Sequence, residues 1–82
     1  MAKFKRLNTR CELISGISIA AERELAALSQ ERLAELINEM GWSINQQTIS
    51  RWESRSSVLI DKNMVKDMEF VIGREQKKFL SL

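Results

Sequence analysis

Side chains that can hydrogen-bond to the edges of nucleic-acid bases gather in one short stretch of the chain. The stretch reads Asn45-Gln46-Gln47-Thr48, and Arg51 follows shortly after it. A glutamine amide can form two hydrogen bonds to adenine, and an arginine can do the same to guanine. A threonine offers a methyl group for thymine and a hydroxyl group for a base or a phosphate. The expected base contacts are Gln46, Gln47, Thr48 and Arg51.

Apolar side chains alternate with these polar ones at helical spacing. Ile49 and Trp52 fall on the opposite face of a helix expected from residue 45 to about residue 53, with Asn45 as its N-cap. The apolar face would anchor the helix, and the polar face could enter the major groove of DNA. Taken singly, Gln46 and Gln47 are better explained as solvated residues at an exposed helix start; the functional interpretation depends on their occurring together with the other features of the motif.

A second helix is expected immediately before this one, from Gln30 to about Met40. Ser29 is its N-cap, and Gly41 suits the left-handed conformation that ends many helices. Its inner face is formed by Leu33, Ala34, Leu36, Ile37 and Met40. The free N–H groups and the positive dipole at its start favour a phosphate, to which the Gln30 amide can also donate. The expected phosphate contacts here and around the reading helix are Ser29, Gln30, Arg32, Asn45, Ser50 and Arg55.

These two helices resemble the helix-turn-helix of the phage repressor and Cro family. LSQERLAEL at 28–36 is similar to that family's second helix, and NQQTISRWE at 45–53 is similar to its third. The resemblance implies a lambda-repressor-like fold, with Gln30 on a phosphate and braced against the reading helix. It also implies Gln46, Gln47 and Arg51 on bases, with Thr48 near the DNA backbone or a base.

The chain departs from the family pattern between the two helices. Five more residues separate Ala34 from Thr48 than the pattern has. We expect the additional residues to lengthen the second helix by about one turn and to widen the connection.

The remaining segments also favour helices, since the chain has no proline and only three glycines. The expected fold is all-α, a compact bundle of four to five helices. A long first helix would begin after a capping box at Thr9 and Glu12. Its apolar face would contain Leu13, Ile14, Ile17, Ala20, Ala21, Leu25 and Leu28. Asp61 would cap a fourth helix that ends near Gly73, with Met64, Val65, Met68, Val71 and Ile72 on one face.

Composition restricts the classes of function. The 82 residues divide into a basic arm at 1–8, a helix-turn-helix domain at 9–73 and a tail at 74–82. Cys11 is the single cysteine, which fits a reducing cytoplasm, and no apolar run is long enough for a membrane span. The chain has no histidine, no spaced metal ligands and no glycine-rich phosphate loop. We therefore expect no enzyme activity, cofactor, metal, membrane contact or small-molecule substrate.

The basic residues are concentrated at the start of the chain. The first ten residues carry four basic side chains and no acid, whereas the net charge of the whole chain is only +2. Such an arm can supply salt-dependent phosphate contacts. The residues expected to do so are Lys3, Lys5 and Arg6. A solubilising tail would have the same composition.

Together these features predict a sequence-specific transcriptional regulator that binds double-stranded operator or promoter DNA in the cytoplasm of a bacterial cell. The first interpretation is a repressor from a phage or another mobile element. One module makes few base contacts, so we expect a homodimer or higher homo-oligomer. Its candidate contacts are Val71, Ile72, Phe79, Leu80 and Leu82. Two alternatives remain: an activator that touches RNA polymerase through Glu22, Glu24 and Glu31, and a protein-interaction module such as an antitoxin or assembly adaptor.

Overall fold

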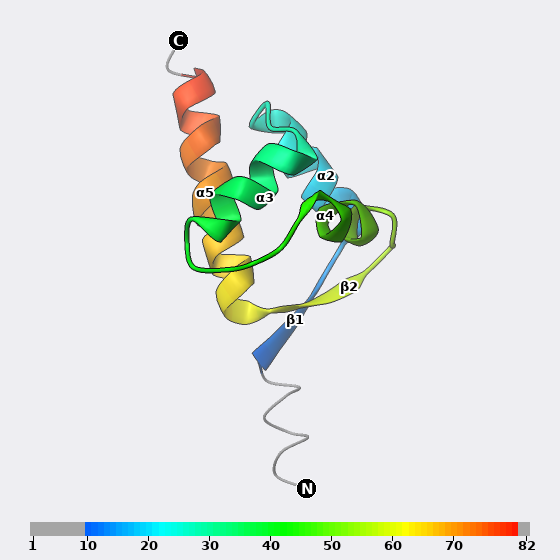
Figure 1. Cartoon of the computed structure of the whole chain (residues 1–82). Coiled ribbons are helices and arrows are strands. Elements are labelled where there is room, and N and C mark those ends of the chain that lie inside the picture. Colours follow the sequence, from blue (N-terminus) through cyan, green and yellow to red (C-terminus); the bar gives the residue numbers. More distant parts are fainter. Residues whose placement is uncertain (1–9, 81–82) are drawn as a thin grey trace, which may run out of the picture.

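The computed structural model of the chain describes residues 10–80 and contains four helices and a two-stranded sheet (Figure 1). The order is β1 (Cys11–Ile14), α2 (Gly16–Leu25), α3 (Gln30–Asn38), α4 (Gln46–Glu53), β2 (Val58–Asp61) and α5 (Lys62–Leu80). Helix α3 packs against both α4 and α5, and α2 packs against α4. No helix in this part of the chain has the length and apolar character needed to cross a bilayer.

Two segments far apart in the sequence form the small antiparallel sheet. β1 pairs with β2 so that Leu13 lies opposite Leu59. The structure thereby corrects the expected long first helix. The apolar and β-branched residues of both segments suit strands, and pairing them satisfies backbone groups beside the buried Ile60. Thr9, the expected cap of the long helix, lies outside the described residues.

Helix α2 begins only after the strand. Ser15 is its N-cap, and its hydroxyl oxygen accepts a hydrogen bond from the backbone N–H three positions on, at 3.3 Å. Its main buried side chain is Ile19, whereas Ile17 and Leu25 are 73% and 63% exposed. The apolar face predicted for the long helix is therefore mostly wrong. The helix begins only after Ser15, so a different set of its residues faces the core.

Gly16 lies where the start of α2 approaches the end of α4. A Cβ atom at this position would collide with the carbonyl oxygens of Trp52 and Arg55. Only glycine permits this approach of two backbones. The resulting contact brings the residues further along α2 within reach of the last turn of α4.

The two helices of the helix-turn-helix begin where the sequence predicts. Ser29 and Asn45 are the N-caps of α3 and α4, and Gly41 has a φ of 103°. Helix α3 is not lengthened, however. It ends at Asn38 rather than Met40, so the five additional residues lie in the connection at residues 39–45. Met40 is exposed and does not belong to the inner face.

Helix α5 is longer than expected. Asp61 precedes it, and its side chain accepts a hydrogen bond from the Asn63 N–H at 2.8 Å, as a cap would. The helix does not end near Gly73 but continues to residue 80. A glycine inside a helix costs only about 1 kcal/mol, and the turn beyond it is tied to α2 by hydrogen bonds from Gln76 to Glu22.

The composition of the core also corrects the contacts to a second copy that were expected in α5. It is formed by Ile19, Ala26, Leu28, Leu33, Ala34, Leu36, Ile37, Ile49, Ile60, Val65, Met68, Val71 and Ile72. Val71 and Ile72 are 0% and 6% exposed. They are core residues, so they are unavailable as contacts to a second copy of the folded chain. The side chains of Phe79 and Leu80, and the whole of Leu82, lie outside the described part.

Candidate nucleic-acid interface

Helix α4 has one anchored face and one free face. Ile49 is completely buried and Trp52 is half-buried against the core. Gln46, Gln47 and Arg51 are exposed. The division predicted for the reading helix is therefore present, because the apolar residues fix α4 to the body and leave the polar ones free to bind.

The start of α4 is fixed by its cap. The Asn45 side-chain oxygen accepts hydrogen bonds from the backbone N–H of Thr48 at 3.0 Å and from its hydroxyl group at 3.2 Å. Because the hydroxyl of Thr48 already donates its proton to Asn45, Thr48 is left with its methyl group and the acceptor side of its oxygen for a base. Asn45 is exposed, whereas Thr48 is half-buried.

The end of α4 is held by an ion pair with α2. Arg23 Nε donates to Glu53 Oε2 at 2.7 Å, and its Nη2 donates to Glu53 Oε1 at 3.0 Å. The Arg23 Nη1 group also donates to the carbonyl oxygen of Leu28 at 2.8 Å. The two side chains are only 13% and 9% exposed. This two-point geometry fixes the direction of both side chains as well as joining the helices.

The ion pair stays charged at neutral pH. Burial raises the pKa of the Glu53 carboxyl, but the hydrogen bonds from Arg23 and Gln30 and the charge of Arg23 outweigh it, so this pKa lies below its ordinary value. The hydrogen bond to Glu53 in turn raises the pKa of Arg23. Both shifts favour the charged forms, so the pair contributes to the folded state over the whole neutral range.

Gln30 connects this ion pair to the start of the reading helix. Its Nε2 donates to Glu53 Oε1 at 2.9 Å, and its Oε1 accepts from Gln46 Nε2 at 3.5 Å, a long hydrogen bond. The first residues of α3 and α4 are therefore side by side. The bracing of Gln30 against the reading helix, which the family resemblance implied, is present in the structure.

Arg23 and Glu53 were absent from the site residues predicted from the sequence. Glu53 ends the motif that resembles the third helix of the family, which is the one local signal that pointed to it. Nothing in the sequence paired it with a residue thirty positions earlier. Only the approach of α2 to α4 at Gly16 brings the two together.

Some of the expected phosphate contacts have a partner within the protein, and others are exposed to solvent. The Ser29 hydroxyl accepts from the Arg32 N–H at 3.0 Å as the cap of α3, and the Arg32 side chain pairs with Glu35 at 3.0 Å. Ser50 and Arg55 are exposed. Among residues 10–80, no acidic side chain pairs with Arg51 or Arg55. Lys3, Lys5 and Arg6 precede the described residues.

A hollow of about 350 Å³ lies between α3 and the start of α4. It is lined by Glu31, Ala34, Glu35, Asn38, Ile44, Asn45, Gln46 and Gln47. Sequence reasoning did not place its two carboxylates beside the reading glutamines. Carboxylates repel phosphate, so Glu31 and Glu35 disfavour a phosphate inside this hollow.

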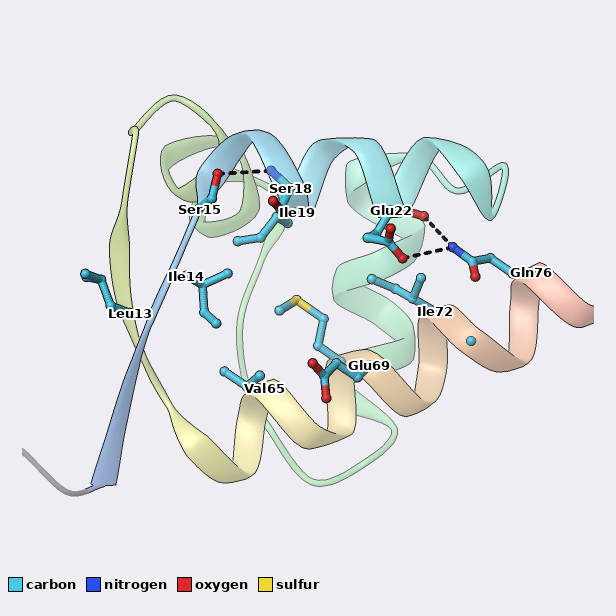
Figure 2. Close-up of a pocket in the computed structure, with 12 residues that line it drawn as sticks. Leu13, Ile14, Ser15, Ser18, Ile19, Glu22, Val65, Glu69, Ile72 and Gln76 are labelled. Carbon is cyan, nitrogen blue, oxygen red and sulfur yellow. Dashed lines mark hydrogen bonds between the residues drawn. The ribbon is translucent and has the colours of Figure 1, made fainter.

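A second hollow, of about 380 Å³, lies between β1, α2 and α5 (Figure 2). Its lining is mainly apolar, with Glu22 and Glu69 on opposite walls and the Gln76 side chain bonded to Glu22. Of the residues predicted to contact DNA that fall within 10–80, none lines it. It therefore lies apart from the candidate interface.

Comparison with known proteins agrees with this geometry. A family model described as helix-turn-helix matches residues 19–69, which includes α3, the connection and α4. No curated protein and no solved structure matches the chain. Within residues 10–80, no three side chains of the metal-binding types come together as a metal site.

Proposed function

This chain belongs to the helix-turn-helix family of phage repressor and Cro type and is a DNA-binding domain; from that premise we propose that it regulates transcription by sequence-specific binding to double-stranded DNA. We further propose that it represses a promoter of a phage or another mobile element. The observation that carries the proposal is the exposed polar start of α4, which a buried face and the braced Gln30 hold in one orientation.

The start of α4 would read bases in the major groove. Gln46 and Gln47 are exposed amides that can pair with adenine, and Arg51 lies one helical turn after Gln47 and can pair with guanine. Thr48 would contribute its methyl group or the acceptor side of its oxygen, because its hydroxyl proton is donated to Asn45. Gln30 would add a phosphate contact beside Gln46.

Phosphate contacts would set the position of this helix on DNA. The start of α3 at Ser29 presents free N–H groups, and the exposed Ser50 and Arg55 lie along or beyond α4. Arg32 would exchange its pair with Glu35 for a phosphate. The basic arm would add contacts that depend on salt and not on sequence.

A homodimer would supply the second reading helix. A single module reaches too few bases for useful discrimination, and two modules on a symmetric site correct this. Because Val71 and Ile72 are core residues, the dimer contact we propose does not involve them. RNA polymerase is a further proposed partner if the protein activates transcription.

The function is tested by selecting bound fragments from a random duplex pool at two salt concentrations. We expect enrichment of an inverted repeat whose half-sites lie about one helical turn apart. Binding without an enriched motif, abolished at the higher salt, would contradict sequence-specific regulation. Transcription from a promoter that carries the selected motif then gives the sign, since a repressor lowers the transcript level and an activator raises it.

A further inference from the structure

The connection between α3 and α4 is a built element and not a loose loop. The connection covers residues 39–45, is longer than the turn of the family pattern and contains neither helix nor strand. Ordinarily a longer loop allows its ends more relative freedom. The reading side chains of α4 begin immediately after it, so any freedom in the connection would pass to them.

Asn38 closes the connection with one side chain. Its Nδ2 donates to the carbonyl oxygen of Ile44 at 2.7 Å, and its Oδ1 accepts from the N–H of the same residue at 2.8 Å. Asn38 is the last residue of α3, and Ile44 immediately precedes Asn45, the cap of α4. The amide therefore joins the end of one helix to the start of the next in a single orientation.

Trp42 ties the middle of the connection to α5. Its indole N–H donates to Asp67 Oδ2 at 2.8 Å, and its ring packs against the core. Both side chains are half-buried. Gly41, immediately before it, has a φ of 103°, and the hydrogen bond to Asp67 holds the indole against α5.

We propose that Asn38, Trp42 and Asp67 are positioning residues for base reading. They hold the start of α4 so that Gln46 and Gln47 meet base edges at hydrogen-bonding distance. A two-point contact to a base tolerates displacements of only about 0.5 Å, whereas attraction to phosphate tolerates far more. Removing these hydrogen bonds therefore weakens discrimination between sequences more than it weakens general binding. This inference rests on the proposed function.

The test compares the affinity for the selected duplex with that for a scrambled duplex in the full chain. Asn38→Ala lowers the ratio of the two affinities at least about fivefold. This is the effect of losing one side-chain contact that makes two hydrogen bonds to a base. Asp67→Ala and Trp42→Phe, which remove the acceptor and the donor of the other hydrogen bond, lower the ratio by a smaller factor. Asp67→Asn retains an acceptor oxygen and restores the ratio of the wild-type protein. Ser43→Ala, an exposed change in the same connection, leaves it unchanged.

The urea midpoint of each variant separates positioning from folding. If Asn38→Ala and Asp67→Ala lower the midpoint but keep the affinity ratio, the residues are merely structural and the proposal is overturned. An unchanged ratio with an unchanged midpoint overturns it as well. If Asn38→Ala does not fold, the Asp67→Ala and Asp67→Asn pair decides between these outcomes. A wild-type protein that prefers no duplex refutes the proposed function itself, and this inference falls with it.

Discussion

The C-terminal end of α4 is held by an ion pair that is almost out of solvent, whereas its N-terminal end is held by neutral hydrogen bonds and is exposed. Glu53 meets Arg23 and Gln30 at one end, and Asn45 caps the other. A charged pair out of water is costly to break, while an exposed amide is free to exchange water for a base. The proposed base contacts Gln46 and Gln47 thus lie at the end of α4 opposite the ion pair that stabilises the fold.

The largest effect we expect is at the anchored end. Glu53→Ala leaves the Arg23 guanidinium with only the exposed Glu24 carboxylate, at 3.9 Å, and should lower the free energy of unfolding by about 3 kcal/mol. Urea denaturation measures this, and Glu53→Gln, which keeps the acceptor oxygen, should cost less. A decrease below about 1 kcal/mol would place this ion pair among ordinary surface pairs and remove the contrast between the two ends.

The next effect is at the reading end and appears in binding alone. Gln47→Ala should weaken binding to the selected duplex by about 1–3 kcal/mol and relax the preference at one base position. Its stability should be unchanged, since the side chain is exposed. Arg55→Ala is the comparison, because Arg55 is a proposed phosphate contact, and the loss of such a contact weakens binding to all sequences alike. If the two variants have the same effect on selected and scrambled duplexes, the assignment of Gln47 to base reading is wrong.

Acid should weaken the anchored end. Because the pKa of Glu53 is lower in the folded chain than in the unfolded chain, its contribution is complete above the ordinary, unfolded pKa of a glutamate. That contribution disappears as the pH falls through the lower, folded value. The urea midpoint should therefore drop on acidification, and the drop should be smaller in Glu53→Gln. An equal drop in both proteins would assign the acid sensitivity to other carboxyl groups.

The smallest effect should come from the exposed face of the sheet. Leu59 is 66% exposed opposite the equally exposed Leu13, so Leu59→Ser removes little buried area. Its free energy of unfolding should stay within about 0.5 kcal/mol of the wild-type value. The matched change at the buried neighbour, Ile60→Ser, should cost several times more by urea denaturation. Equal decreases would mean that Leu59 is covered in solution.

Much of the candidate site was predictable because its signals are local. The caps at Ser29 and Asn45, the left-handed Gly41 and the buried Ile49 each depend on neighbours within about four positions. The division of α4 into an anchored and an exposed face follows from the same helical period. The base and phosphate contacts themselves remain predictions.

The sequence by itself therefore determined where α3 and α4 begin, because capping hydrogen bonds within one turn decide this. It also determined which of their residues face outward, because the helical period of the apolar residues decides that. Tertiary structure alone decided the pairing of residues 11–14 with 58–61, the ion pair between Arg23 and Glu53, and the passage of α5 through Gly73. In each case the partner lies in another part of the chain, and the contact with it outweighs a local preference. These preferences were for a long first helix at residues 11–14, for solvated charges at Arg23 and Glu53, and for a helix end at Gly73.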